Sequence, residues 1–367
     1  MSEFIQKKAR PEIFNLKPYV PGKPIEEVQR ELGIDDIIKL ASNENPLGPS
    51  PLGKKAFSEV VDKLHIYPDA NCFKLKQKLS ETLDCDPQEL LVGNGSDELL
   101  KLLAETFLNP GDEIIFAQPS FAEYEFTATI MGAKSVKVPL IDFKHDLEAM
   151  LSAITPRTKM VYICNPNNPT GTIVTAQEID SFMTRVPQDV LIVFDEAYYE
   201  YVESPVYASG VKYVKDGRNA VVLRTFSKIY GLAALRVGYG VTTPDIAAAV
   251  ERVTEPFNVN TPAQVAAAAA LDDKEHLEQS RKVNQAGKNY LYEEFKKLQL
   301  KYQETDANFI FVDTGKDSQE VFQRLLKQGV IIRSGDIFGY PTYIRVTVGN
   351  EKENARFIEG LKKILGA

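Results

Sequence analysis

Short runs of hydrophobic residues recur along the first two thirds of the chain and predict strands. Apolar and β-branched residues stand at consecutive positions in each run, which is typical of strands that are buried on both faces of a sheet. The runs cover residues 113–116, 135–138, 160–164, 190–194, 220–223 and 236–241.

Between most of these runs lie segments with apolar residues at three- and four-residue spacing, which predict amphipathic helices. Strands and helices that alternate in this way predict an α/β fold with a large, mainly parallel sheet covered by helices on both faces. The predicted helices cover residues 74–83, 97–107, 122–131, 147–154, 176–186 and 245–254.

The pattern changes after about residue 255 and predicts a smaller α+β unit at the end of the chain. An alanine-rich helix and a long charged helix open this unit, and strands then alternate with helices. We expect helices at 263–271, 274–298, 318–328 and 351–365, and strands at 309–313, 330–333 and 343–347.

The proline-rich start of the chain predicts an arm rather than a domain. We expect this arm, residues 1–45, to pack on the small domain and on a partner subunit. The large domain is then expected to cover residues 46–258, and the small C-terminal domain residues 259–367.

Charge and composition exclude several classes of protein. The 43 basic and 51 acidic residues give a net charge of −8, which argues against nucleic acid and anionic membrane as partners. The longest apolar stretch, 265–271, is far shorter than the roughly 20 residues of a membrane-spanning helix. Residues 1–10 lack the pattern of a secretory signal, so we expect a cytoplasmic protein.

Familiar metal and nucleotide motifs are also missing. Three cysteines at unrelated spacings favour reduced thiols over disulfides or a zinc site. Three histidines without ligand spacing argue against a histidine-based metal site or hydrolase triad. The Gly93-Asn-Gly95 turn lacks the third glycine of a dinucleotide-binding motif, and no Gly-Lys-Ser/Thr phosphate loop occurs. We therefore expect no metal.

Four segments at the ends of predicted strands remain as candidate sites, because ligands of open α/β sheets bind at that edge. The turn at 92–98 opens a helix, whose first N–H groups are suited to a phosphate, although this segment taken alone favours a plain capped helix. In the segment 162–171, Asn165 and Asn168 precede prolines and are held extended, either as part of a site or as a simple turn.

The other two segments carry charged residues. Asp195 ends a fully apolar strand, and a buried carboxylate costs several kcal/mol unless a cation pairs with it. Lys228 follows another apolar strand, where burial would lower its pKa and make it a nucleophile; a solvated lysine is the alternative. Arg236 is suited to clamp a phosphate, or to pair with a carboxylate.

Together, the order and spacing of these segments resemble the pyridoxal-phosphate-dependent aminotransferases of fold type I, in the class that includes histidinol-phosphate aminotransferases. The resemblance extends from Leu40-Ala-Ser-Asn-Glu-Asn-Pro-Leu-Gly48 to Ile344-Arg-Val-Thr-Val-Gly349. It implies a large mainly parallel-sheet α/β/α domain, a smaller α+β domain and pyridoxal 5'-phosphate as cofactor.

The resemblance also implies the roles of individual residues. Lys228 would form the covalent bond with the cofactor and then move a proton, and Asp195 would face the pyridine nitrogen. Asn168 and Tyr198 would hydrogen-bond the phenolic oxygen of the cofactor, and Phe121 would stack on its ring. The cofactor phosphate would be held by Gly95, Ser96, Asp97, Ser227 and Arg236.

Two further groups of residues follow from the same resemblance. Tyr67 would reach the cofactor phosphate of a neighbouring subunit, which implies a homodimer with shared active sites. Substrate would be bound by Tyr19, Asn45, Arg333 and Arg345. One position departs from the family pattern: Ile229 stands where a small residue is common, and we expect it to narrow the pocket wall.

The resulting prediction is an enzyme of histidine biosynthesis that converts L-histidinol phosphate and 2-oxoglutarate to imidazole acetol phosphate and L-glutamate. Its two half-reactions would alternate in one pocket, passing through a Schiff base of Lys228. Alternatives on the same framework are an aromatic amino acid aminotransferase, a phosphothreonine decarboxylase and a β-eliminating enzyme. A non-catalytic module that binds the cofactor is the alternative from another class.

Overall fold

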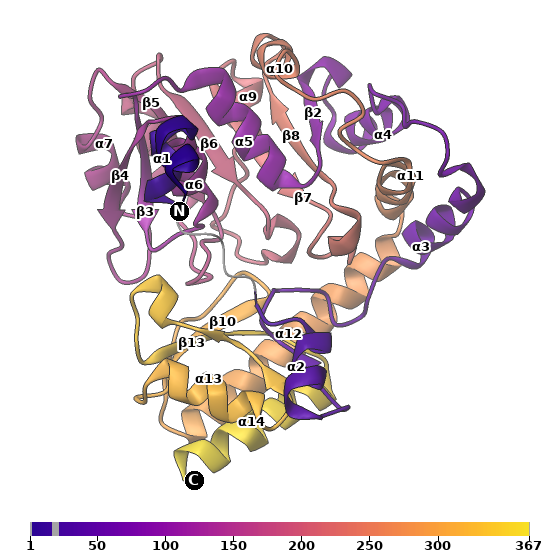
Figure 1. Ribbon diagram of the computed structural model, residues 1–367, viewed down its shortest axis with the longest axis vertical. Coiled ribbons are helices and arrows are strands. Elements are labelled where there is room, and N and C mark those ends of the chain that lie inside the picture. Colours follow the sequence, from indigo (N-terminus) through magenta and orange to yellow (C-terminus); the bar gives the residue numbers. More distant parts are fainter. Residues whose placement is uncertain (1, 17–21, 367) are drawn as a thin grey trace.

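The computed structural model describes residues 2–16 and 22–366, which form a large and a small α/β unit side by side (Figure 1). Residues 1, 17–21 and 367 lie outside the described part. The long helix α12 (Lys274–Lys297) runs along the small unit and leads into it from the large one (Figure 1).

A seven-stranded sheet forms the centre of the large unit, with the strand order β2-β8-β7-β6-β5-β3-β4. Only β8 is antiparallel to its neighbours, β2 and β7, and the remaining pairs are parallel. The prediction of a mainly parallel sheet is confirmed. The strands are β2 (Leu90–Gly93), β3 (Glu113–Gln118), β4 (Lys134–Pro139), β5 (Thr158–Cys164), β6 (Leu191–Asp195), β7 (Ala220–Thr225) and β8 (Gly238–Thr242).

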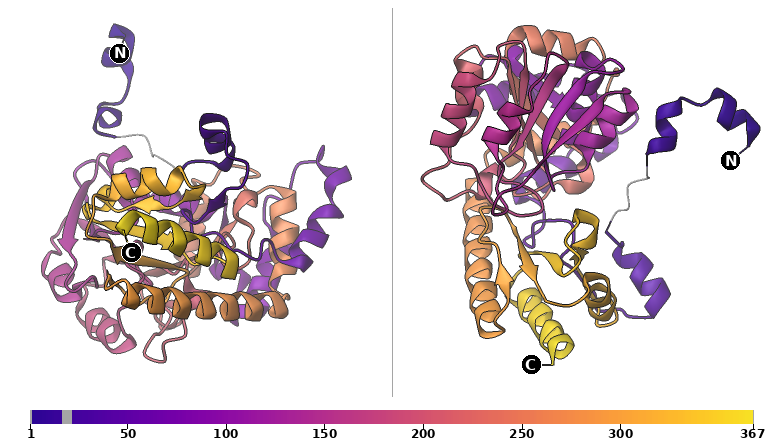
Figure 2. Two further views of the ribbon diagram at one scale, coloured as in Figure 1. Left: turned by 90° about the horizontal axis from the view of Figure 1, so that it is seen from below. Right: turned by 90° about the vertical axis from the view of Figure 1, so that its left-hand side faces the viewer.

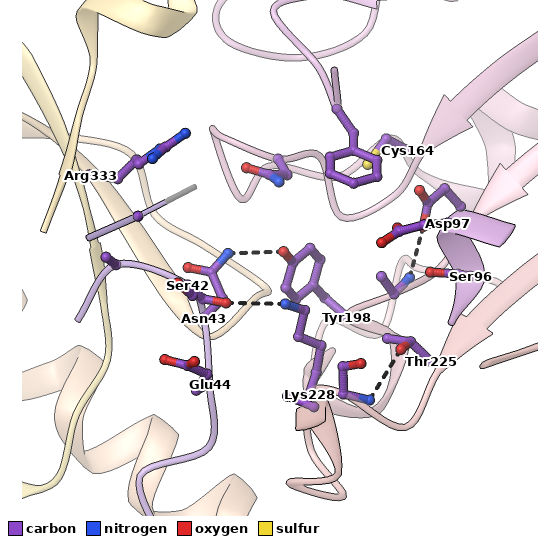
Figure 3. A pocket seen from close by; sticks show the side chains of 18 of the residues that line it. Ser42, Asn43, Glu44, Ser96, Asp97, Cys164, Tyr198, Thr225, Lys228 and Arg333 are labelled. Atoms are coloured by element: carbon purple, nitrogen blue, oxygen red, sulfur yellow. Dashed lines mark hydrogen bonds between the residues drawn. The ribbon is translucent and has the colours of Figure 1, made fainter. Parts of the chain in front are cut away.

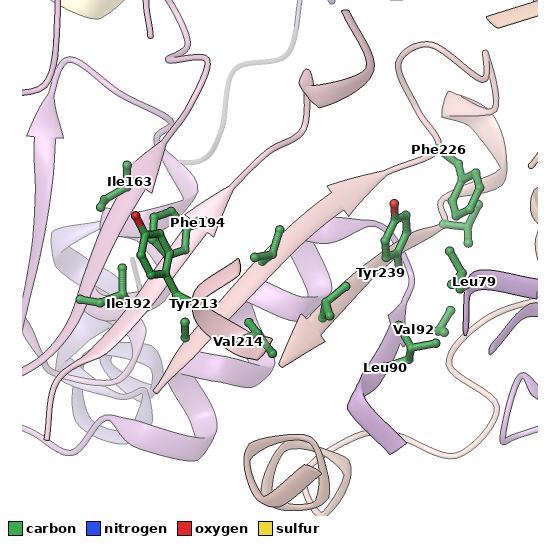
Figure 4. Packing of buried hydrophobic residues seen from close by; sticks show 14 of the residues in the cluster. Leu79, Leu90, Val92, Ile163, Ile192, Phe194, Tyr213, Val214, Phe226 and Tyr239 are labelled. Carbon is green, nitrogen blue, oxygen red and sulfur yellow. The ribbon is translucent and has the colours of Figure 1, made fainter. Parts of the chain in front are cut away.

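Helices cover both faces of this sheet, because its central strands bury side chains on both sides. In β6, Ile192 and Phe194 belong to the core on one face, whereas Leu191 and Val193 belong to the core on the other. The first core, part of which is drawn in Figure 4, contains residues of α4 (Phe73–Leu83), α7 (Leu147–Ser152), α8 (Ala176–Arg185), α9 (Val211–Lys215) and α11 (Thr261–Ala270). The second contains residues of α5 (Ser96–Phe107), α6 (Glu123–Ile130) and α10 (Pro244–Glu251).

The small unit is built on a four-stranded antiparallel sheet with the order β12-β13-β10-β9. Its core joins this sheet to the helices α12, α13 (Ser318–Leu326) and α14 (Glu351–Leu365). The strands are β9 (Lys301–Tyr302), β10 (Phe309–Asp313), β12 (Arg333–Ser334) and β13 (Tyr343–Thr347). A smaller α+β unit is thus confirmed.

One predicted strand, 330–333, is divided between two sheets. Its first part, β11 (Val330–Ile331), pairs in parallel with β1 (Ile38–Lys39), whereas its second part is β12. The N-terminal segment therefore contributes a strand to the small unit.

Other parts of the N-terminal segment lie in two different places. The helix α2 (Ile25–Leu32) packs through Val28 onto Leu326 and Ile331 of the small unit. The turn η1 (Pro11–Asn15) packs against α6, where the Arg10 side chain donates to the Ile130 carbonyl, and the helix α1 (Glu3–Lys8) extends away from the body of the molecule (Figure 2). The boundaries at residues 45 and 258 stay predictions.

The structure also bears on membrane-spanning helices and on the state of the cysteines. Among the described residues, none of the helices has both the length and the apolar character needed to cross a lipid bilayer. All three cysteines, Cys72, Cys85 and Cys164, are free thiols, and Cys72 and Cys164 are buried.

Candidate active site

A cavity of about 270 Å³ lies between the two units, where β6 and β7 end. Figure 3 shows that its walls come from segments far apart in the sequence. Eleven of the predicted site residues line it: Ser96, Asp97, Phe121, Asn168, Asp195, Tyr198, Ser227, Lys228, Arg236, Arg333 and Arg345. The structure therefore brings together the four strand-end segments and the C-terminal arginines.

Lys228 extends into the cavity from the loop that follows β7. Its Nζ donates a hydrogen bond of 3.2 Å to the Ser42 carbonyl and lies 5.6 Å from the centre of the Tyr198 ring. Burial, followed by the positive charge of Arg345, lowers the pKa of the Lys228 amine to about 8. A far larger share of this amine is therefore neutral near physiological pH than for an exposed lysine, as a nucleophile or a proton acceptor requires.

Asp195 is buried at the end of β6, with its carboxyl on the cavity wall. Its Oδ2 accepts a hydrogen bond of 2.6 Å from the Tyr124 hydroxyl, and its Oδ1 accepts one of 3.2 Å from the Ala197 amide. Burial raises the pKa of Asp195 to about 6. Neither partner is a cation, so the carboxylate would gain most from a positively charged group bound in the cavity.

Tyr198 and Asn168 line the cavity and are both held by residues of other elements. In Figure 3 the Tyr198 ring lies between Asn43 and the start of α5. The Tyr198 hydroxyl accepts a hydrogen bond of 2.9 Å from Asn43 Nδ2, and its ring packs edge-on against Phe309. Asn168 Oδ1 accepts a hydrogen bond of 2.6 Å from Arg345 Nη1. The small unit and the N-terminal segment thereby fix the direction of both side chains.

The start of α5 and the Arg236 side chain form a cradle of N–H groups. Arg236 donates to Asp97 Oδ2 at 3.1 Å and to Ser227 Oγ at 3.3 Å. Gly95, at φ +85°, allows this approach, because a Cβ there would lie 2.5 Å from Arg236 Nη2. Backbone N–H groups at a helix start together with a guanidinium favour a phosphate.

Arg345 and Arg333 supply positive charge from the small unit. Arg345 stands on β13 and donates to Asn168 Oδ1 at 2.6 Å and to the Ala41 carbonyl at 2.7 Å. Arg333 stands on β12, opposite Arg345 in the sheet. Both arginines also line a second cavity of about 510 Å³, which shares Phe121 and Asn168 with the first and extends to Asn15 and Leu16.

Several predicted residues lie elsewhere. Tyr67 is exposed and stacks on Phe257, outside the cavity of its own chain. Asn45 is buried behind the lysine loop, where its amide donates to the Ile229 carbonyl and to Ser280 Oγ. The expectation that Ile229 narrows the pocket is wrong, because its side chain is buried in the core of the large unit. Tyr19 lies outside the described residues.

The structure adds residues that the sequence analysis left without a role. They are Ser42, Asn43 and Glu44, together with Cys164, Thr225 and the buried Tyr124. The motif at 40–48 was the available signal for the first three. Because all its central residues are polar, hydrophobic periodicity does not tell which of them face the cavity.

Comparison with known proteins agrees with this geometry. The family model described as "Aminotransferase class I and II" matches residues 35–361. The chain belongs to this family. It is 58% identical to the histidinol-phosphate aminotransferase of Moorella thermoacetica, over 98% of this chain and 93% of that protein. It is 49% identical to the one of Caldicellulosiruptor saccharolyticus, over 96% and 99% of the two chains.

A solved structure supports the same assignment. The crystal structure of histidinol-phosphate aminotransferase from Sinorhizobium meliloti in complex with pyridoxal 5'-phosphate has a TM-score of 0.91 to this chain. The two chains are 27% identical, and the match covers 98% of each. Fold type I is therefore confirmed.

Pyridoxal 5'-phosphate is the cofactor of this family, and the cavity fits it. The cradle at Gly95 is suited to the phosphate, the buried Asp195 carboxylate to a pyridinium nitrogen, and the Lys228 amine to an aldehyde. Throughout residues 2–16 and 22–366, no group of three or more histidine, cysteine or acidic side chains is placed to hold a metal ion.

Proposed function

We propose that the protein catalyses amino-group transfer between L-histidinol phosphate and 2-oxoglutarate, giving imidazole acetol phosphate and L-glutamate in histidine biosynthesis. The supporting observation is a single cavity that contains Lys228, Asp195 and the two arginines of the small unit. The relatives that are 58% and 49% identical carry this activity in their names.

The residues on the large-unit side of the cavity would bind and orient the cofactor. When bound, pyridoxal 5'-phosphate supplies an aldehyde that carries the amino group and a ring that stabilises negative charge. Asp195 would hold a proton on the pyridine nitrogen, and Tyr198 and Asn168 would hydrogen-bond the phenolic oxygen. Phe121 would pack on the ring, while Ser96, Asp97, Ser227 and Arg236 would hold the phosphate.

Lys228 would anchor the cofactor and then act as the proton carrier. A pKa of about 8 allows its Nζ to accept a proton from the substrate carbon and to return it at another position. The Ser42 carbonyl holds this amine at 3.2 Å and keeps it in the cavity.

Arg345 and Arg333 would bind the anionic groups of both substrates. A dicarboxylate and a phosphate monoester both present oxygens that match the guanidinium fork. The second cavity, which begins at these arginines, offers about 510 Å³ for the imidazole end of histidinol phosphate. The same two arginines would thus serve both half-reactions.

The deciding experiment compares amino donors. Loss of the cofactor's visible absorption is followed after adding histidinol phosphate or phenylalanine, each without an acceptor. We expect histidinol phosphate to act at far lower concentration. A preference for phenylalanine would instead establish an aromatic aminotransferase, and release of carbon dioxide or of β-elimination products would reveal the other chemistries.

We also propose that two copies of the chain form a dimer that shares its active sites. Eight exposed apolar side chains, called here the apolar surface, support this proposal: Leu52, Phe57, Val61, Leu64, Ile66, Tyr67 and Phe73, with Phe257 stacked on Tyr67. Several large apolar side chains left exposed near one another in the sequence are typical of protein interfaces. Tyr67 lies within this surface and outside its own cavity, as a residue that serves the partner's site must.

We also propose a division of the chain into two domains and an N-terminal arm. Residues 46–258 would form the cofactor-binding domain and residues 259–367 the small domain, with an arm at 1–45. The arm's contacts with α6 and α13 support a role in joining the two domains. We propose a cytoplasmic location as well, where free 2-oxoglutarate and glutamate are the co-substrates.

A further inference from the structure

We propose that Asn43 is a positioning residue: it donates to the Tyr198 hydroxyl and so directs the proton of that hydroxyl into the cavity. This inference rests on the proposed function, in which Tyr198 donates to the phenolic oxygen of the cofactor. It concerns a residue to which neither the motifs nor the comparisons assign a role.

The orientation of the Asn43 amide is set by Thr347. The Thr347 hydroxyl accepts the Asn43 backbone N–H at 2.9 Å and donates its own proton to Asn43 Oδ1 at 3.1 Å. The amide NH2 group then faces the other way and donates to Tyr198 Oη at 2.9 Å. Asn43 is buried, at 1% exposed, so solvent does not compete for these bonds.

A phenol has one proton, and the Asn43 contact leaves that proton unused. Among the described residues, Tyr198 Oη makes no other hydrogen bond, so its proton is directed at the cavity. The titratable and charged groups that face Tyr198 are Lys228, Arg345, Asp195 and Cys164. Burial raises the pKa of Tyr198 above its usual value, and the hydroxyl therefore stays protonated at neutral pH.

The backbone explains why an asparagine suits this position. Asn43 has φ +58°, a left-handed conformation that asparagine and aspartate adopt more readily than most residues. Its carbonyl accepts a hydrogen bond of 3.0 Å from Asn308 Nδ2, which holds the segment to the small unit. Asn43→Asp would keep this shape and backbone but would turn the donor into an acceptor.

The test measures the pH midpoint of the bound cofactor's visible absorption. The variants are Asn43→Asp, Tyr198→Phe and the two together, with Asn43→Gly as a variant that keeps the backbone freedom and removes the amide. A donor to the phenolic oxygen stabilises the deprotonated chromophore. Tyr198→Phe should therefore raise the midpoint by about one pH unit, the effect of one hydrogen bond to a charged group.

Asn43→Asp should raise the midpoint by a similar amount, because Tyr198 would then donate to the carboxylate introduced by this substitution rather than into the cavity. Adding Asn43→Asp to Tyr198→Phe should cause no further shift. Glu44→Gln changes one charge in the same segment and measures the effect of charge alone. Thr347→Val, which removes the anchor of the amide, should give part of the Asn43→Asp shift.

Three results would overturn the inference in distinguishable ways. If Tyr198→Phe raises the midpoint and neither Asn43→Asp nor Thr347→Val does, Asn43 has no positioning role, while the proposed role of Tyr198 stands. If Tyr198→Phe leaves the midpoint unchanged, the role of Tyr198 falls and the inference with it. A full Asn43→Asp shift in the Tyr198→Phe background would show a charge effect and also overturn the inference.

Discussion

The carboxyl of Asp195 couples the stability of the cofactor-free protein to pH. Its pKa of about 6 in the folded chain lies above the value of about 3.9 of an exposed aspartate, so the folded state binds this proton more tightly. The stabilisation from this group is fully present below about pH 4 and is lost as the pH rises to about 6.

Asp195→Asn should therefore stabilise the cofactor-free protein at pH 7.5, because asparagine needs no proton and still accepts from Tyr124. We expect the free energy of unfolding to rise by about 1–3 kcal/mol at pH 7.5 and to change little at pH 4. Urea unfolding at the two pH values measures this difference. Activity should fall about 100-fold or more. A variant no more stable than the parent at pH 7.5 would contradict the argument.

The lowered pKa of Lys228 leads to a second prediction, on the rate of cofactor capture. Only the neutral amine attacks an aldehyde, so the rate should rise with pH up to about 8 and then level off. Stopped-flow absorbance with the cofactor-free protein measures this rate. Arg345→Gln removes a positive charge and should move the midpoint to higher pH. Arg185→Gln, on the exposed end of α8, should not move it.

Gly95 provides a third prediction, with Gly111 as its control. Both have a positive φ, but a Cβ at Gly95 would meet the Arg236 guanidinium, whereas nothing lies within 4 Å of a Cβ at Gly111. Alanine at either position should cost about 1 kcal/mol of stability from backbone strain. Only Gly95→Ala should weaken cofactor binding, by about tenfold or more, as measured by titration. Equal affinities would show that the cradle is not the phosphate site.

Periodicity predicted most helices and strands of both units, but it missed the short helices α3 (Pro51–Ser58) and α9 (Val211–Lys215) and failed where strands are short. The strand β2 was missed, because Leu90-Leu91-Val92 runs directly into the glycine turn. The strand predicted at 236–241 begins only at Gly238 in the structure, because the Arg236 backbone is left-handed. The division of 330–333 between two sheets depends on pairing with β1, which lies near the other end of the sequence. The hydrophobic pattern within one segment does not identify the distant strand with which that segment pairs.

The packing of α11 on α3 (Pro51–Ser58) provides a fourth prediction. A Cβ at Gly53 of α3 would lie 3.1 Å from the Ala266 carbonyl, so the two helices approach closely. Ala266 is buried and Ala269 is partly exposed. Ala266→Leu should lower the free energy of unfolding by about 1–3 kcal/mol, and Ala269→Leu by clearly less. Thermal or urea unfolding of the two variants compares them directly, and equal losses would contradict close packing at Ala266.

The apolar surface around Tyr67 leads to a fifth prediction, on assembly. Leu64, a member of this set of side chains, is 59% exposed, and Ile141, which is not a member, is 58% exposed. In the proposed dimer, Leu64→Asp should give a monomer in light scattering and lower activity at least about tenfold, because a buried unpaired charge disrupts an interface. Ile141→Asp should remain dimeric and active. A dimeric Leu64→Asp protein would place the interface elsewhere.

Some residues of the candidate site could be predicted from the sequence, and others could not. Lys228 and Asp195 were found because each follows an apolar strand, and strand ends meet at one edge of the sheet. Asn45 was chosen within the motif at 40–48, yet it is Asn43 that faces the cavity. The direction of each polar side chain there depends on Thr347 and on Ile229, residues far along the chain.

The segment at 40–43 joins the earliest and the latest parts of the chain. The Leu40 carbonyl accepts from the Thr347 amide, and Lys228 reaches the Ser42 carbonyl. During synthesis on the ribosome, residues 40–43 leave the exit tunnel long before Thr347 is made. The large sheet has all its strands by residue 242, so a nascent chain can fold that sheet while its active centre is still incomplete. The active centre is therefore completed only after β13 has been made and its residues Arg345 and Thr347 have bonded to the segment at 40–43.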